Sequence, residues 1–133
     1  MKIYFAASVR GGRDDEDLYR ALIIELTRYG TVLTEHIAHP KDVERGMTDR
    51  EIYERDMGWL READVMVAEV TTPSLGVGYE LASAQQHGKR ILCLFRTSSG
   101  RSLSAMISGA EELEVVEYDN LEEATTAIET FLI

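Results

Sequence analysis

The chain of 133 residues is 44% hydrophobic and 29% charged, which is typical of one globular domain, expected here to span residues 1–133. Its formal net charge of −10 argues against a broad phosphate-binding surface, so no nucleic-acid partner is expected. Its apolar runs are far shorter than the roughly 20 residues that cross a bilayer, and the first residues do not resemble a signal peptide. We therefore expect no membrane partner and a cytoplasmic location.

Strand-like and helix-like segments alternate along the chain. Apolar segments predict strands at 2–7, 31–34, 65–70, 90–95 and 114–118. Helices are predicted at about 14–29, 48–63, 103–108 and 121–132, and a further helix, with Glu80 in its first turn, is predicted to end at about 87. This alternation predicts an α/β fold of the flavodoxin-like or Rossmann-like class, with a five-stranded parallel sheet in the order 2-1-3-4-5 and helices on both faces.

Several residues mark the helix ends. Gly30 follows the first predicted helix, where a glycine commonly adopts a left-handed conformation, and Gly88 ends the third. Thr48, with Glu51 three residues later, matches a capping box at the start of the second helix.

The loops that follow the strands are the expected ligand site, because such sheets bind ligands beyond the carboxyl ends of their strands. The first of these loops offers backbone amides, a hydroxyl and guanidinium groups near a helix N-terminus, as an anion site would. Its candidate residues are Ser8, Arg10, Gly11, Gly12 and Arg13. The alternative is a glycine turn with solvated arginines, but a second loop rich in Ser, Gly and Arg, at 98–104, favours phosphate binding.

Asp56 falls on the apolar stripe of the second helix, together with Ile52, Leu60 and Ala63. A carboxylate there must be paired, hydrogen-bonded or facing a cavity, because an unpaired buried charge is costly. It is either a structural partner of an arginine or an acid of the site.

Glu80 is predicted in the first turn of the helix that follows the third strand, where the helix dipole would keep it ionised. Either it only offsets that dipole, or it forms a two-carboxylate site with Asp56 that suits glycosyl transfer. In the second case Gly76 and Gly78 would bend the backbone close to a sugar.

The remaining candidates are weaker. His36 follows the second strand and could contact a base or a phosphate, although a lone histidine is often structural. Cys93, the single cysteine, lies in an aliphatic run and is expected to be a buried thiol. The spacing of His, Cys, Asp and Glu suggests no metal site, and no cofactor is implied.

Four segments, taken together and in order, resemble the 2'-deoxynucleoside 5'-phosphate N-hydrolases (Rcl) of the nucleoside 2-deoxyribosyltransferase superfamily. They are IYFAASVRGGRDD, YGTVLTEH, DMGWLREADVMVAEVTTPSLGVGYELA and ILCLFRTSSGRSLSAMI. The resemblance implies hydrolysis of deoxynucleoside monophosphates to free base and 2-deoxyribose 5-phosphate, through a covalent intermediate. It departs from the family at Ala6 and Ala7, and in a shorter segment between His36 and Thr48, which bears on base preference.

The resemblance also implies roles for single residues. Glu80 matches the nucleophile, Asp56 the general acid/base and Tyr4 a tyrosine near the sugar. Phosphate-site positions are matched by Ser8, Arg10, Ser74 and Ser104, and a position near the base by His36. Ser104 and Met106 would reach the neighbouring subunit's site, which implies a homodimer. The alternatives are a ribonucleoside monophosphate hydrolase and a nucleotide sensor without activity.

Overall fold

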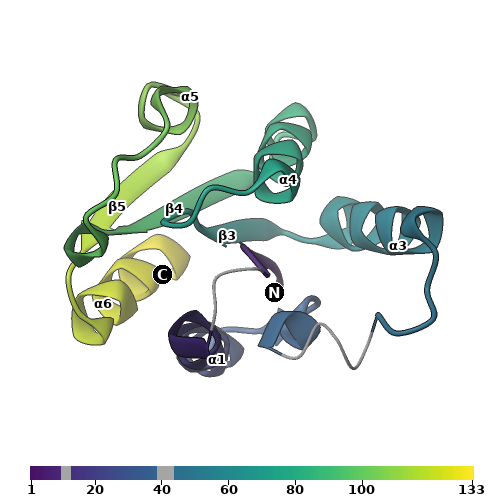
Figure 1. The fold of residues 1–133 in the computed structure, drawn as a ribbon, viewed down its shortest axis with the longest axis horizontal. Coiled ribbons are helices and arrows are strands. Elements are labelled where there is room, and N and C mark those ends of the chain that lie inside the picture. Colours follow the sequence, from purple (N-terminus) through teal and green to yellow (C-terminus); the bar gives the residue numbers. More distant parts are fainter. Residues whose placement is uncertain (10–12, 39–43) are drawn as a thin grey trace.

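The structure is a computed structural model that describes residues 1–9, 13–38 and 44–133 (Figure 1). Five strands and seven helical segments follow each other along these ranges. In chain order they are β1 (Lys2–Ala7), α1 (Arg13–Thr27), β2 (Thr31–Val32), the 3-10 helix η1 (Glu35–Ala38), α3 (Asp49–Glu62), β3 (Val65–Glu69), α4 (Leu75–Gln86), β4 (Arg90–Arg96), the 3-10 helix η2 (Thr97–Ser99), α5 (Ala105–Ser108), β5 (Glu114–Tyr118) and α6 (Leu121–Leu132).

The five strands form one parallel sheet in the order β2-β1-β3-β4-β5, which confirms the predicted fold class and strand order. Helices α1 and α6 cover one face of the sheet, and α3 and α4 cover the other (Figure 1). The central strand β3 is buried at all five positions, because helices cover both of its faces.

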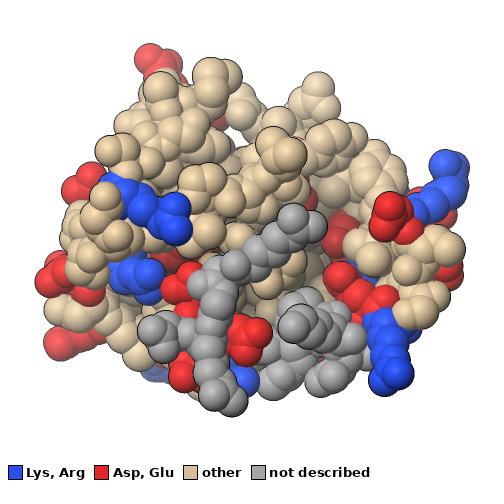
Figure 2. Space-filling view, in the orientation of Figure 1, with Lys and Arg blue, Asp and Glu red and all other residues tan. Residues whose placement is uncertain are grey.

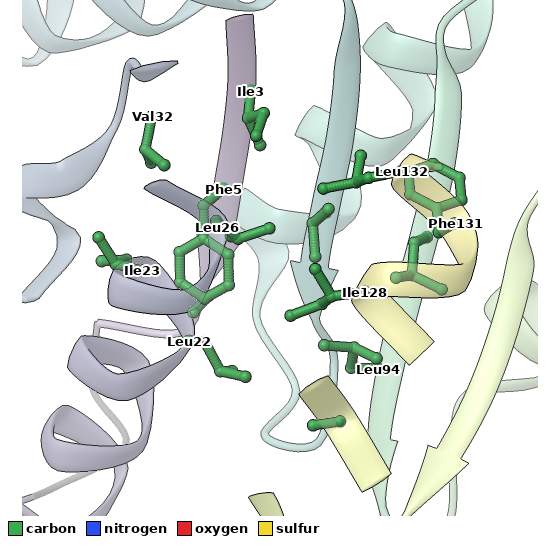
Figure 3. Packing of buried hydrophobic residues seen from close by; sticks show 14 of the residues in the cluster. Ile3, Phe5, Leu22, Ile23, Leu26, Val32, Leu94, Ile128, Phe131 and Leu132 are labelled. Atoms are coloured by element: carbon green, nitrogen blue, oxygen red, sulfur yellow. The ribbon is translucent and has the colours of Figure 1, made fainter. Parts of the chain in front are cut away.

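Each face of the sheet has its own apolar cluster. On the first face, Leu22 of α1 and Ile128 of α6 pack against Phe5 and Leu94 of the sheet (Figure 3). Burial of each such side chain stabilises the fold by about 1.5 to 3 kcal/mol. The second cluster lies under α3 and α4 and includes Tyr4 of β1. The residues of β1 therefore alternate between a purely structural face and the face that carries Tyr4.

The capping box of α3 is confirmed. The Thr48 hydroxyl accepts from the backbone N–H of Glu51 at 3.1 Å, and the Glu51 carboxylate accepts from the Thr48 N–H at 3.0 Å. The predicted bounds of the last strand and last helix are also confirmed. Strand β2 is shorter than predicted, because the hydroxyl of Thr34 bonds both the N–H and the C=O of Phe5 at 2.9 and 2.6 Å.

The conformation predicted for Gly30 is wrong. Among the described residues, positive φ angles occur at Gly46, Gly88 and Gly100, with values of 83°, 69° and 73°. Gly30 instead lies against the start of the chain, where an added Cβ would be 2.1 Å from the carbonyl oxygen of Met1. A close backbone approach therefore requires glycine here, whereas Gly88 has the left-handed conformation typical of a helix end.

None of the helices in the described ranges has the length and apolar character needed to cross a bilayer.

Candidate active site

Tyr4 and Glu80 meet on the sheet face that α3 and α4 cover. Tyr4 is 1% exposed, and its hydroxyl donates a hydrogen bond to Oε2 of Glu80. Burial, followed by the neighbouring Glu80 carboxylate, raises the pKa of Tyr4, so the phenol stays protonated and remains a donor. Tyr4, on the sheet, therefore fixes one oxygen of the Glu80 carboxylate.

Glu80 lies one turn deeper in its helix than the sequence predicts. Helix α4 starts at Leu75, because the hydroxyl of Ser74 caps it by accepting from the N–H of Val77 at 3.2 Å. Glu80 is thus in the second turn, and the expectation that the helix dipole keeps it ionised is wrong. Burial raises the pKa of Glu80 to about 7, and the negative charges of Asp56 and Glu44 add to the rise, against the lowering effect of Tyr4.

The glycines before Glu80 do not form the predicted bend, since both are regular residues of α4. A Cβ added to Gly76 would lie 3.9 Å from Oε1 of Glu80, an ordinary contact distance, and one added to Gly78 would meet open space. Glycine at position 76 leaves the helix surface beside the Glu80 carboxylate open, which is useful where a ligand must come close.

Asp56 reaches the same face from α3 and is partly buried. Its Oδ1 accepts from Nε of Arg55 at 3.0 Å, so the arginine pairing that the sequence left open is present. Burial nevertheless raises the pKa of Asp56, outweighing the arginine. The charge of Asp56 raises the pKa of both Glu80 and Tyr4, so Asp56 acts electrostatically on the hydrogen-bonded pair. These three side chains are here called the carboxylate site.

His36 of η1 lines the other side of Arg55. It is 8% exposed, and its ring centroid lies 5.4 Å from that of Trp59. Its Nε2 is 3.1 Å from Nη2 of Arg55 and 3.5 Å from Glu44. A guanidinium can only donate hydrogen bonds, so Nε2 of His36 must be an unprotonated acceptor towards Arg55. Because this contact is shorter than the one to Glu44, we assign a neutral ring to His36. Burial and Arg55 both lower the pKa of His36, in agreement with this assignment.

The residues predicted to hold phosphate are spread more widely. Ser8 directly follows β1 and is 4% exposed. Arg10, Gly11 and Gly12 lie outside the described residues, as does the side chain of Arg13. The hydroxyl of Ser104 caps α5 by accepting from the N–H of Met106 at 3.2 Å, as Ser74 caps α4.

A groove of about 530 Å³ runs between α4 and α5, here called the α4–α5 groove. Ser74, Gly78, Ser104 and Met106 line it, together with apolar side chains such as Leu81. The described lining of this groove does not include Tyr4, Asp56 or Glu80. Within one chain, Ser104 and Met106 therefore belong to a different surface from the carboxylate site.

A second polar cluster, which the sequence did not predict, lies on the opposite face of the sheet. Glu69, at the end of β3, is 1% exposed and accepts hydrogen bonds from the hydroxyl of Tyr118, the N–H of Thr71 at 2.8 Å and the Thr71 hydroxyl at 2.9 Å. An acid that ends an all-apolar strand was the available signal. The bonds fix the turn between β3 and α4, which gives Glu69 a structural role.

The predicted environment of Cys93 is confirmed. The side chain is fully buried in β4, and this burial raises the pKa of its thiol to about 12. In the described part of the chain, no cluster of three or more His, Cys, Asp or Glu could hold a metal ion.

Comparisons with known proteins identify the family. The profile of the family described as nucleoside 2-deoxyribosyltransferase matches residues 3–121. A Mus musculus protein named 5-hydroxymethyl-dUMP N-hydrolase is 58% identical over 114 residues, which cover 83% of this chain and 66% of that protein. A Tetraodon nigroviridis protein of the same name is 55% identical over 115 residues, covering 84% of this chain and 81% of that protein.

A solved structure of the Clostridium botulinum CMP N-glycosidase superposes with a TM-score of 0.69 over 97% of this chain and 99% of that chain. At 17% sequence identity, this likeness concerns the fold. The match with the mouse protein spans just under two thirds of that protein's length. The family profile, however, covers the strands and helices that build the carboxylate site. This chain belongs to the nucleoside 2-deoxyribosyltransferase family.

Proposed function

We propose that this protein hydrolyses the N-glycosidic bond of 2'-deoxynucleoside 5'-monophosphates to a free base and 2-deoxyribose 5-phosphate. The observation that carries the proposal is the carboxylate site, in which Tyr4 bonds Glu80 and the charge of Asp56 acts on Glu80. Two carboxyl groups with raised pKa values on one buried face suit glycosyl transfer. The names of the relatives, which specify a deoxynucleotide N-hydrolase, support this substrate class.

In the first step, a carboxylate oxygen of Glu80 attacks the anomeric carbon while the bond to the base nitrogen breaks. Asp56 gives its proton to the departing base. The hydroxyl of Tyr4, bonded to Oε2, orients the carboxylate and leaves Oε1 as the attacking atom. The product is a free base and a deoxyribosyl ester of Glu80.

In the second step, water attacks the same carbon from the opposite side, and Asp56 accepts the proton of that water. The ester bond breaks, Glu80 leaves as a carboxylate, and 2-deoxyribose 5-phosphate is released. Two displacements at one carbon give overall retention. Every atom and proton is accounted for by the two carboxyl groups and water, so the proposed reaction needs no cofactor.

The phosphate of the substrate is assigned to Ser8, Arg10, Gly11, Gly12 and Arg13, and to Ser74 at the start of α4. Ser8 directly follows β1, the strand that carries Tyr4, so a phosphate near it would lie on the carboxyl side of the sheet. His36, whose neutral ring lies 5.4 Å from that of Trp59 at a tilt of 43°, is assigned to the base. Gly76, beside Oε1 of Glu80, leaves room for the sugar, whereas Gly78 lines the α4–α5 groove.

We also propose a homodimer in which Ser104 and Met106 complete the neighbouring subunit's site. Leu75 and Met106 are 97% and 81% exposed on either side of the α4–α5 groove, and apolar side chains this exposed favour a protein partner. The surface over α4 and α5 carries few charged side chains in the view of Figure 2. The free thiol of Cys93 fits the reducing conditions of the cytoplasm, the location we propose.

A panel assay tests the reaction. Folded protein is incubated with dGMP, dAMP, dCMP, dTMP and 5-hydroxymethyl-dUMP, and with GMP and CMP, and the free base is quantified by chromatography. We expect release from at least one deoxynucleotide, and a lower rate with the matching ribonucleotide. Protein with Glu80→Gln, purified in parallel, controls for contaminating enzymes. Release from none of the deoxynucleotides, or only from the ribonucleotides, would contradict the proposal.

A further inference from the structure

Arg55 of α3 contacts several residues in and around the carboxylate site. Its Nε and Nη2 lie 3.0 and 2.9 Å from Oδ1 of Asp56, and the same Nη2 donates to Glu44 at 2.8 Å. Its Nη1 donates to the sulfur of Met47 at 3.3 Å, and its guanidinium carbon lies 4.8 Å from the ring centroid of Trp59. The guanidinium is thus fixed on several sides.

The two oxygens of the Asp56 carboxylate are treated differently. Both nitrogens of Arg55 that reach Asp56 contact Oδ1. Oδ2 accepts no hydrogen bond from any residue that the structure describes, although every fully buried side-chain N or O atom in those ranges has a partner. Within the described ranges, Oδ2 is thus the oxygen of Asp56 that has no protein partner.

From this difference, and resting on the proposed function, we propose that Arg55 is a positioning residue for the reaction. It holds Oδ1 of Asp56 from one side, so that Oδ2 faces the substrate as the atom that gives and accepts the proton. A carboxylate on a single Cα–Cβ stem would otherwise rotate, and proton transfer requires a fixed short distance to the leaving nitrogen. Arg55 itself does not touch the reacting atoms in this arrangement.

The rigidity of Arg55 supports this role over simple charge neutralisation. Its side chain is 16% exposed, and it contacts Glu44, His36 and Trp59 in addition to Asp56. By contrast, Arg50 on the same helix is 85% exposed and pairs only with its helix neighbour Glu54 among the described residues. An exposed pair of that kind contributes little to stability. Arg50 therefore provides a matched control.

The test compares Arg55→Gln, Arg55→Lys and the control Arg50→Gln, with kcat and KM measured across pH for the best deoxynucleotide. Loss of a positioning contact is expected to lower kcat of Arg55→Gln by about 10 to 100-fold with KM changed less than about threefold. Arg55→Lys keeps the charge but cannot contact Oδ1 of Asp56 with two nitrogens, so it should recover only part of kcat. Arg50→Gln should match the unchanged protein in both constants.

The pH profile separates positioning from a general loss of structure. Asp56 is surrounded by Arg55, His36 and Glu44, and by Tyr4 and Glu80, whose pKa values its own charge raises. Removing the arginine removes a group that lowers the pKa of Asp56, so the acid limb of kcat/KM should move to higher pH. Carbon NMR titration of the Asp56 carboxyl reports the same shift without turnover.

The outcomes are distinct. If the unchanged protein releases no base while the NMR titration of Arg55→Gln shows the upward shift, the proposed function fails and the contact stands. If the unchanged protein is active, and Arg55→Gln keeps both its kcat and its acid limb, Arg55 is not a positioning residue. Arg55→Gln protein that does not fold would leave Arg55→Lys as the deciding variant, since it retains the charge on α3.

Discussion

The hydroxyl of Tyr4 on β1 donates a hydrogen bond to the carboxylate of Glu80 on α4, 76 residues further along the chain. This bond joins the sheet to the helix at the centre of the carboxylate site. It is formed between one group that is fully buried and one that is partly buried, where a hydrogen bond to a charged group is worth about 1.5 to 3 kcal/mol. The proposed role of Glu80 as the nucleophile depends on the orientation that this hydrogen bond gives to its carboxylate.

Replacing Tyr4 with phenylalanine should therefore lower kcat/KM by about 10 to 100-fold, since the attacking carboxylate loses its fixed orientation. Loss of the bond also removes a group that lowers the pKa of Glu80, so less of the nucleophile is ionised at neutral pH. Steady-state kinetics at a fixed pH measures the effect. Tyr79→Phe is the matched control, because Tyr79 lies on the same helix, is 55% exposed and bonds only Tyr53 among the described residues. Equal kcat/KM values for the two variants would contradict the role of Tyr4.

The pH profile should report the shared proton of Asp56 and Glu80. The proposed reactive form carries one proton on this pair, and the last proton leaves it near the pKa of Glu80, which burial raises to about 7. We expect kcat/KM to fall about tenfold per pH unit above that pH. Initial rates from pH 5 to pH 9, in buffers of constant ionic strength, measure it. A rate that rises through pH 7 to a plateau would show that only ionised Glu80 is needed and that Asp56 gives no proton.

Glu80→Gln should stabilise the fold, and the gain should grow with pH. Burial raises the pKa of Glu80 from 4.5 to about 7 in the folded protein, so between these values the folded state binds the proton more tightly than the unfolded state. Stability contributed by this group is therefore present at low pH and lost as pH rises towards 7. Glutamine keeps an acceptor for Tyr4 without the charge. We expect the free energy of unfolding in urea to gain about 2 kcal/mol more at pH 8 than at pH 5. A gain that is equal at both pH values would contradict the burial of Glu80.

Met106→Glu should separate the proposed dimer. Met106 is 81% exposed at the α4–α5 groove, and a charge placed in an apolar interface is costly to desolvate. We expect sedimentation to show a dimer for the unchanged protein and a monomer with reduced activity for the variant. Ile24→Glu is the control, because Ile24 is 62% exposed on α1, which covers the other face of the sheet. A protein that is monomeric and fully active without any substitution would contradict the shared site.

Much of the fold could be predicted because its signals are local. Strand β3 is apolar at four of its five positions, VMVAE, and the capping box of α3 is contained within Thr48 to Glu51. The role of Gly30 could not be predicted, because it depends on the carbonyl of Met1, which the sheet brings close. Local helix signals describe a left-handed end and carry no information on such a contact.

The site residues follow the same division. Asp56 was identified because a carboxylate on an apolar stripe conflicts with burial, and it lies in the carboxylate site with Arg55. The protonation of Glu80 was predicted wrongly, because the cap at Ser74 moves the helix start and burial then outweighs the dipole. Glu69 was missed, since its partner Tyr118 lies on β5, and the contacts of Arg55 with Glu44 and His36 were missed because these residues precede α3.

The stereochemistry of transfer to methanol tests the central claim, that Glu80 attacks the sugar, most directly. Methanol added to the reaction competes with water for the glycosyl group and gives a methyl 2-deoxyriboside 5-phosphate whose anomer is read by proton NMR. An attack by Glu80 followed by attack of methanol from the opposite side predicts the β anomer, with the configuration of the substrate retained. The α anomer would show a single displacement and would contradict the role of Glu80 as the nucleophile.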